Sequence, residues 1–201
     1  MGVNQGLGAA VRRGLARALD WEPVAVAFCD ADGEYAPEEL ASVVAPILAG
    51  RADYVVGSRF AGRPRHMLPH RWLGNRVLTV WVRLMVRRWG VRGLTDGQSG
   101  YRALSPEAAA AAEIVHDFNY AQVLTLDLLA KGFRYSEVPI SYRFRTEGRS
   151  FIRLGRYLRD GRGGLRHVPR GPGPPEIGRA AGGKRVDCRA QIPVVARGLK
   201  K

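Results

Sequence analysis

The chain has 201 residues, of which 46% are hydrophobic and 25% are charged, and its formal net charge is +14. This composition is typical of one globular domain and excludes a disulfide-stapled protein, because only two cysteines are present. No apolar run approaches the roughly 20 residues that span a bilayer, and the first residues include no apolar signal region. The charge predicts an anionic partner, such as a nucleotide, a lipid phosphate, a membrane surface or a nucleic acid.

Residues 4–19 read as a glycine turn that leads into a helix. Leucine or valine recurs every fourth residue, which gives one apolar stripe. Backbone amides at the start of such a helix, around Gly8, can bind an anion. The alternative is that the glycines only close a loop.

The next element predicted is a buried strand over residues 24–28, and three carboxylates follow it at alternate positions. In an open α/β sheet, ligands bind just past the C-terminal ends of the strands. Asp30 and Asp32 offer hard oxygen ligands to Mg²⁺ or Mn²⁺, and Glu34 follows them. A structural turn is the alternative, since Asp bonds its own backbone and Gly33 accepts positive φ.

A helix that begins at Pro37 and ends at Gly50 is followed by a short strand over residues 53–57. The order helix, strand, helix, strand predicts an α/β sheet with largely parallel strands. Arg59 follows the second strand, and its guanidinium matches the geometry of a phosphate. A solvated basic loop is the competing interpretation.

Residues 70–89 predict a helix in which arginines and tryptophans alternate with aliphatic residues. Two interpretations stay open. An amphipathic helix of Arg and Trp is suited to lie in a membrane interface. An ordinary helix with an apolar face toward the core and a basic outer face has the same composition.

The loop over residues 94–103 is polar, contains Asp96 and Arg102, and is of the kind that holds substrates. Asp96 can alternatively stabilise the loop as an Asx turn. Helices are predicted after Ser105, as N-cap, and over residues 119–131. A strand is predicted over residues 133–142, where a proline indicates an edge or a bulge.

The chain changes character near residue 161, where glycine, proline and arginine accumulate. We therefore expect a folded domain over residues 1–164 and a basic, disordered tail over residues 165–201. The tail has nine Lys or Arg and two acidic residues, so its net charge of +7 is half of the total. This distribution weakens the case for a nucleic acid as the partner.

Several motifs follow one another in the chain: Asp-Ala-Asp-Gly at the end of a strand, Pro-Glu-Glu at a helix start, Ala-Asp-Tyr-Val-Val-Gly-Ser-Arg-Phe, Leu73–Arg76, Thr95–Arg102, Glu137–Ile140 and Gly148–Ser150. In this order they resemble the motifs of family 2 glycosyltransferases, and the similarity is greatest to the dolichyl- or polyprenyl-phosphate mannosyltransferases. The resemblance runs from about Asn4 to Arg159 and implies a partial GT-A, Rossmann-like sheet with flanking helices that lacks the first strands of the family.

The resemblance also implies an activity. The enzyme would transfer a hexose, with inversion and metal assistance, from a GDP-mannose or UDP-glucose type donor to a polyprenyl- or dolichyl-phosphate. Mg²⁺ or Mn²⁺ would be the cofactor. The protein would be cytoplasmic and bind the inner face of the membrane peripherally, and no nucleic acid would be a partner.

The resemblance assigns roles to individual residues. Metal ligands would be Asp30, Asp32 and Glu34; catalytic residues would be Asp32, Asp96 and Arg102; the acceptor phosphate would meet Arg59; and the donor would meet Arg145 and Gly8. Glu34 stands where the subgroup often has Gln, and Phe151 where it often has Lys.

One departure concerns the start of the family pattern. A first strand with a Pro-x-x-Asn-Glu motif, a helix and a second strand that ends in Asp bind the nucleoside in the family, and this chain begins after them. We therefore expect weak or absent nucleotide binding and impaired activity. The alternatives are a catalytically inactive, membrane-associated fragment and a basic nucleic-acid-binding module.

Overall fold

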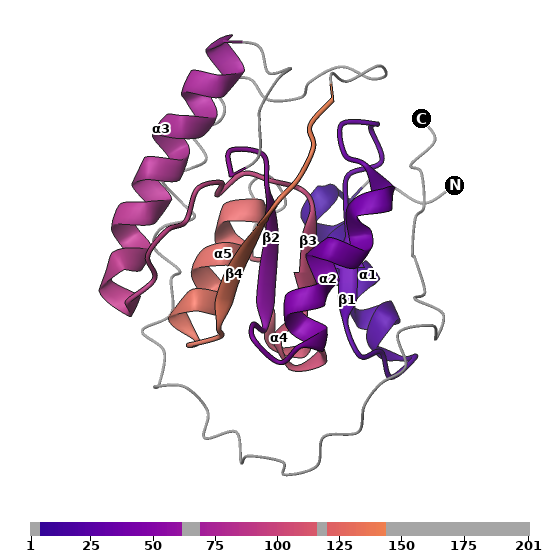
Figure 1. Ribbon diagram of the computed structural model, residues 1–201. Helices are drawn as coiled ribbons and strands as arrows, with labels where there is room; N and C mark the ends of the chain where they lie inside the picture. Colours follow the sequence, from indigo (N-terminus) through magenta and orange to yellow (C-terminus); the bar gives the residue numbers. More distant parts are fainter. Residues whose placement is uncertain (1–4, 62–68, 116–119, 144–201) are drawn as a thin grey trace.

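The computed structural model describes residues 5–61, 69–115 and 120–143 (Figure 1). Its elements in chain order are α1 (Leu7–Leu19), β1 (Val26–Phe28), η1 (Pro37–Glu39), α2 (Leu40–Leu48), β2 (Tyr54–Ser58), α3 (Pro69–Val86), η2 (Arg87–Trp89), β3 (Arg102–Leu104), α4 (Pro106–Ala111), α5 (Tyr120–Ala130) and β4 (Tyr135–Pro139). The predictions that concern Arg145, the motif at 148–150, the domain limit at 164 and the tail lie outside the described residues.

The sheet of the described residues is mixed. Its strand order is β1-β3-β2-β4, and β2 and β4 are parallel. β3 runs antiparallel to both of its neighbours, with Arg102 opposite Phe28 on one side and Val56 on the other. The expectation of largely parallel strands is therefore wrong for the centre of the sheet. A three-residue strand directly after a polar loop has too little periodicity to be recognised as a strand.

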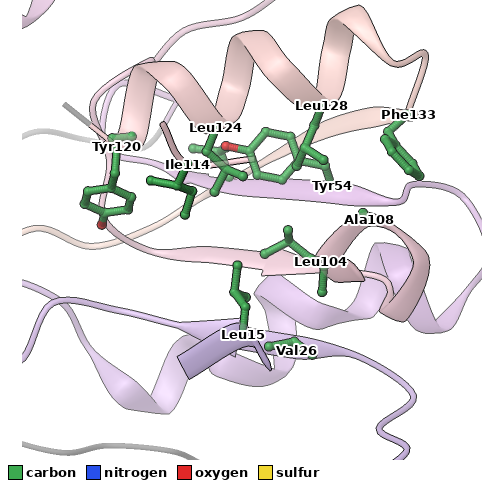
Figure 2. Close-up of a cluster of buried hydrophobic side chains, with 13 residues drawn as sticks. Leu15, Val26, Tyr54, Leu104, Ala108, Ile114, Tyr120, Leu124, Leu128 and Phe133 are labelled. Carbon is green, nitrogen blue, oxygen red and sulfur yellow. The ribbon is translucent and has the colours of Figure 1, made fainter. Parts of the chain in front are cut away.

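Successive residues of the strands point to opposite faces of the sheet, and each face carries its own core. Tyr54 and Val56 of β2 join Leu104 on the face that α1, α4 and α5 cover (Figure 2). Val55 and Ala103 belong to the cluster on the other face, which α2 covers. In Figure 1, α2 lies in front of the sheet and α5 lies behind β4. The result is a three-layer α/β fold.

Local sequence signals begin and end these elements where they were expected. The Ser105 hydroxyl accepts a hydrogen bond from the amide of Ala108 and caps α4, with Pro106 in the first turn. Gly132 follows α5 with a φ of 84°, a value that favours glycine. Pro139 lies at the end of β4, which is an edge strand of the sheet among the described residues, in line with the expected edge or bulge.

α3 is attached to the remainder of the domain through α5. Val82 and Val86 of α3 form a third buried cluster with Leu94 and with Leu126 and Leu129 of α5. None of the helices in the described ranges is both long enough and apolar enough to cross a membrane.

Candidate active site

The polar residues predicted as functional meet at one edge of the sheet. Because β1, β2 and β4 point the same way and β3 points the opposite way, the first three end where β3 begins. Asp30 and Asp32 follow β1, Arg59 follows β2, and Asp96 lies in the loop before β3. The fold thus brings together groups that are up to 66 residues apart in the chain.

The carboxylate of Asp30 lies directly against the backbone of Gly100. A Cβ atom built on Gly100 would stand 2.2 Å from Oδ2 of Asp30 and 2.6 Å from its Cγ. The phenol of Tyr35 accepts a hydrogen bond of 2.8 Å from the amide of the same glycine. Burial, partly offset by the charge of Arg59, raises the pKa of Tyr35 to about 12, and Asp30 adds to the increase. The turn at residues 30–34, which we call the acidic turn, is therefore in direct contact with the loop at residues 94–101.

The predicted trio of metal ligands is not assembled. Gly33 has a φ of 75°, so the chain turns there and the alternation that would align the three carboxylates ends. Glu34 is 3% exposed, and its amide donates to Oδ1 of Asp32 over 3.1 Å. Within the described ranges, no three His, Cys, Asp or Glu side chains come together as a metal site. Asp30 and Asp32 are the carboxylates of the turn that remain half-exposed.

Arg59 and Asp96 form a buried, bidentate ion pair. Nε of Arg59 lies 2.7 Å from Oδ2 of Asp96, and Nη2 lies 2.9 Å from Oδ1. Arg59 is 4% exposed and Asp96 is fully buried. Burial acts to raise the pKa of Asp96, but the charge and hydrogen bonds of Arg59 outweigh it and hold this pKa below its usual value. Burial acts to lower the pKa of Arg59, but Tyr35 and Asp96 raise it above the usual value. Both groups are thus charged, and the predicted role of Arg59 toward an acceptor phosphate stays a prediction.

Asp96 also forms the Asx turn that the sequence analysis gave as its alternative role. Its Oδ1 accepts a hydrogen bond of 3.0 Å from the amide of Gln98, and its Oδ2 accepts one of 3.1 Å from the amide of Arg59. The Asx turn and the ion pair use the same carboxylate. Asp96 therefore has a fixed position in the loop, where it holds the Arg59 guanidinium and the amide of Gln98, and its catalytic role stays a prediction.

Glu137 of β4 anchors this loop, and the sequence did not single it out for that role. Its carboxylate accepts hydrogen bonds from the amides of Thr95, at 2.8 and 3.0 Å, and Asp96, at 3.2 Å. The hydroxyls of Thr95 and Tyr135 donate to it as well. Thr95 in turn bonds the hydroxyl of Ser58 over 2.6 Å. An acidic residue inside a strand pattern was the signal available in the sequence.

The structure buries Arg102, which the sequence predicted at the sugar and acceptor site, and its role there stays a prediction. The side chain is 0% exposed and lies on the α5 face of the sheet, because Arg102 is the first residue of β3 and points away from α2. Its Nε donates to the carbonyl of Ser99 over 2.8 Å, and its Nη1 donates to the hydroxyls of Thr125 and Tyr54. Arg102 thus contacts the loop at residues 94–101 from the α5 face of the sheet.

α3 holds the same loop from the other side. The hydroxyl of Thr79 accepts a hydrogen bond of 3.2 Å from the amide of Gly97, and Nε of Arg83 donates to the carbonyl of Leu94 over 2.8 Å. Gly8 lies buried in the first turn of α1, and the predicted role of that turn toward the donor stays a prediction. Arg145 lies outside the described residues.

Residues 1–97 match the profile of glycosyl transferase family 2. The chain carries a glycosyltransferase family 2 domain. It is 38% identical over 108 residues to the UDP-N-acetylglucosamine–dolichyl-phosphate N-acetylglucosaminyltransferase of Methanococcus voltae, an alignment that covers 52% of this chain and 41% of the relative. It is 31% identical over 149 residues to the polyprenol monophosphomannose synthase of Mycolicibacterium smegmatis, with coverage of 71% and 54%.

The fold is that of GT-A glycosyltransferases. Glucosyl-3-phosphoglycerate synthase from Mycobacterium tuberculosis, crystallised with Mn²⁺, UDP-glucose and phosphoglyceric acid, superposes with a TM-score of 0.55 at 20% identity over 82% of this chain and 55% of that one. This likeness shows the family 2 domain to have the expected architecture. The chain spans about half the length of the curated relatives that it matches.

Proposed function

We propose that this family 2 domain transfers a hexose from a nucleotide-sugar donor to a polyprenyl- or dolichyl-phosphate acceptor. The observation that carries the proposal is the contact of the acidic turn, through Asp30 and Gly100, with the loop that holds the Arg59–Asp96 pair. Such a site offers carboxylates for a metal ion that binds the donor diphosphate, and it places the Arg59–Asp96 ion pair beside them. The named relatives that use dolichyl phosphate or make polyprenol monophosphomannose support the acceptor class.

Asp30 and Asp32 fit a role as ligands of Mg²⁺ or Mn²⁺. Mg²⁺ is usually bound by one or two carboxylates together with substrate phosphates and water, so a third carboxylate is not required. Both side chains are half-exposed, and Gly100 leaves the space that the Asp30 carboxylate uses. When bound, the metal would supply positive charge that stabilises the departing nucleoside diphosphate. The neighbour crystallised with Mn²⁺ and UDP-glucose supports a divalent ion, and a donor of the GDP-mannose or UDP-glucose type is proposed.

The residues of the chain suit a displacement at the anomeric carbon of the sugar that inverts its configuration. An oxygen of the acceptor phosphate forms a bond to the anomeric carbon while the bond from that carbon to the donor diphosphate breaks, and the electron pair leaves with the diphosphate. The acceptor phosphate is already anionic near neutral pH and needs little help from a general base. Arg59 would attract it, while Asp96 fixes the guanidinium in place. Arg145 and the amides near Gly8 are proposed to contact the donor.

Product formation tests the proposal. The full chain is incubated with Mn²⁺, polyprenyl phosphate and either GDP-mannose, UDP-glucose or UDP-N-acetylglucosamine, and the glycolipid is quantified. Slow transfer is expected from one donor, and Asp32→Ala is expected to reduce it about 100-fold or more. Asp20→Asn is the matched control, because Asp20 is an exposed carboxylate that pairs with Arg17 on the surface.

Two results would refute the proposal: no glycolipid from any donor, or equal rates for the wild type and Asp32→Ala. The first would favour an inactive, membrane-associated scaffold. Titration calorimetry with each donor and Mn²⁺ checks the expectation of weak nucleotide binding, which a micromolar affinity would contradict.

A further inference from the structure

The carboxylate of Glu137 in β4 is occupied by hydrogen bonds from its neighbours. The amides of Thr95 and Asp96 donate to it, and so do the hydroxyls of Thr95 and Tyr135. An ionised carboxylate accepts about four hydrogen bonds, which is the number of donors that surround this one. Any effect that Glu137 has on a reaction must therefore pass through these neighbours.

The direction of each proton in this network follows from the carboxylate. Because an ionised carboxylate only accepts, the hydroxyl of Thr95 gives its single proton to Glu137. The hydroxyl of Ser58, 2.6 Å away, must then donate to Thr95. Ser58 in turn accepts hydrogen bonds of 3.2 and 3.0 Å from the amides of Phe60 and Ala61. We call the side chains of Glu137, Thr95 and Ser58 the Glu137 bridge, and it joins β4 to the turn after β2.

Both members of the Arg59–Asp96 ion pair are attached to the Glu137 bridge. Arg59 lies in the turn whose amides bond Ser58, and the amide of Asp96 donates to Glu137 itself over 3.2 Å. We propose that Glu137 is a positioning residue for glycosyl transfer, which holds Arg59 and Asp96 in place without touching either substrate. This deepens the proposed function and rests on it in one respect, namely that Arg59 binds the acceptor phosphate.

The strand gives Glu137 a fixed position that the ion pair does not have by itself. β4 lies beside β2 and pairs with it in parallel, with Glu137 opposite Val56 (Figure 1). Arg59 and Asp96 lie in connections outside the strands, and groups on strands hold their places more precisely than groups on loops. The register of the sheet thus sets the position of the ion pair through the Glu137 bridge.

The substitution Glu137→Gln keeps the volume of the side chain but not the network. An amide group has one accepting oxygen and an NH2 group that only donates. With its NH2 group toward Thr95, the Thr95 hydroxyl would have to turn its proton toward Ser58, whose oxygen already accepts two amides. With its NH2 group turned the other way, it would face the amide of Asp96 and the hydroxyl of Tyr135, which are both donors. Glu137→Gln therefore breaks the Glu137 bridge with little change in packing.

Hydrogen exchange tests the Glu137 bridge without any substrate. Amide exchange is followed by NMR on the full chain, for the wild type and Glu137→Gln. We expect the amides of Thr95 and Asp96 to exchange about tenfold faster or more in the variant. Glu39→Gln is the matched control, because the Glu39 carboxylate also accepts hydrogen bonds from an amide and a hydroxyl, those of Ser141. The control is expected to leave the exchange at Thr95 and Asp96 unchanged.

The kinetic constants separate positioning from a general loss of structure. Transfer is measured with Mn²⁺, a nucleotide-sugar donor and detergent-dispersed polyprenyl phosphate. In Glu137→Gln, the KM for the acceptor is expected to rise about tenfold and the KM for the donor to change less than about twofold, whereas partial unfolding would lower kcat alone. Ser58→Ala is a second variant, which removes only the link to the turn of Arg59. It is expected to raise the acceptor KM to a similar extent while the amides of Thr95 and Asp96 exchange as in the wild type.

Unchanged exchange at Thr95 and Asp96 in Glu137→Gln, or an acceptor KM equal to that of the wild type, would overturn the proposal. A fall in kcat alone would also overturn it, because Glu137 would then serve only the fold. An inactive wild type would instead refute the proposed function, and the role of Glu137 in transfer with it, while the exchange rates would still report on the Glu137 bridge.

Discussion

Gly100 provides the sharpest test of how the acidic turn and the loop work together. The substitution is Gly100→Ala. Gly100 is not among the glycines with positive φ, so alanine introduces no backbone strain there. The new Cβ would lie 2.2 Å from Oδ2 of Asp30, whereas real Cβ atoms essentially never approach closer than 3.0 Å. The carboxylate must therefore move by at least about 0.8 Å.

A movement of that size matters more for catalysis than for folding. Oxygen ligands of Mg²⁺ lie within about 2.0–2.1 Å of the ion, and a misplacement of about 1 Å can reduce a rate about 100-fold. We expect kcat/KM to fall by about 100-fold, which corresponds to about 2.7 kcal/mol of transition-state stabilisation. Asp30 is half-exposed and its carboxylate can rotate away, so the free energy of unfolding should change by less than about 1 kcal/mol.

The assay combines Mn²⁺ titration, glycolipid formation and thermal denaturation for the wild type and the variant. Gly97→Ala is the control in the same loop, because its Cβ would meet only Val82 at 3.5 Å, an ordinary contact. We expect Gly97→Ala to keep both the Mn²⁺ affinity and the rate. If Gly100→Ala also kept both, with an unchanged melting temperature, the Asp30 carboxylate beside Gly100 would not be part of the site.

Three further predictions concern the groups around this contact. Arg59→Met leaves the Asp96 carboxylate buried without its bidentate partner and should lower the free energy of unfolding by about 3–5 kcal/mol in urea denaturation; a loss below about 1 kcal/mol would contradict the ion pair. Tyr35→Phe leaves the amide of Gly100 without its acceptor and should cost about 1–3 kcal/mol in the same assay, and wild-type stability would show the bond to be dispensable. The pKa of Asp96 is lowered in the folded state, so its contribution to stability is complete above about pH 4 and is lost as the pH falls through the folded pKa. Acid denaturation followed by circular dichroism should show Asp96→Asn to be less sensitive to pH in that range than the wild type, and identical slopes would refute the assignment.

The helices were largely readable from the sequence because their signals are local. The apolar stripe and glycine turn of α1, the proline at the start of η1 and the Ser105 cap each involve residues within a few positions of one another. The acidic turn was readable for the same reason, since a strand followed by alternating carboxylates is a local pattern. Its metal-binding role remains a prediction for Asp30 and Asp32.

The sequence could not place residues whose contacts depend on another strand. Arg102 looks like a loop residue in the chain, but pairing with β1 and β2 makes it the start of a central strand and buries it against Tyr54 and Thr125. Glu137 has no local partner except Tyr135, and it acts on Thr95, which is 42 residues away. Glu34 continues an alternating pattern, but the chain turns at Gly33 and Glu34 is buried, so its role as a metal ligand stays a prediction.

The amino-acid order thus determined the family, the helices and the place of the acidic turn at a strand end, because each is encoded in neighbouring residues. Only the tertiary structure decided which charges face one another and which faces are covered. Strand pairing brings Arg59 beside Asp96 and Asp30 beside Gly100, and helix packing buries Val82 and Val86 of α3 against α5. Contacts between distant residues depend on the register and the direction of strands, and no short stretch of sequence carries that information.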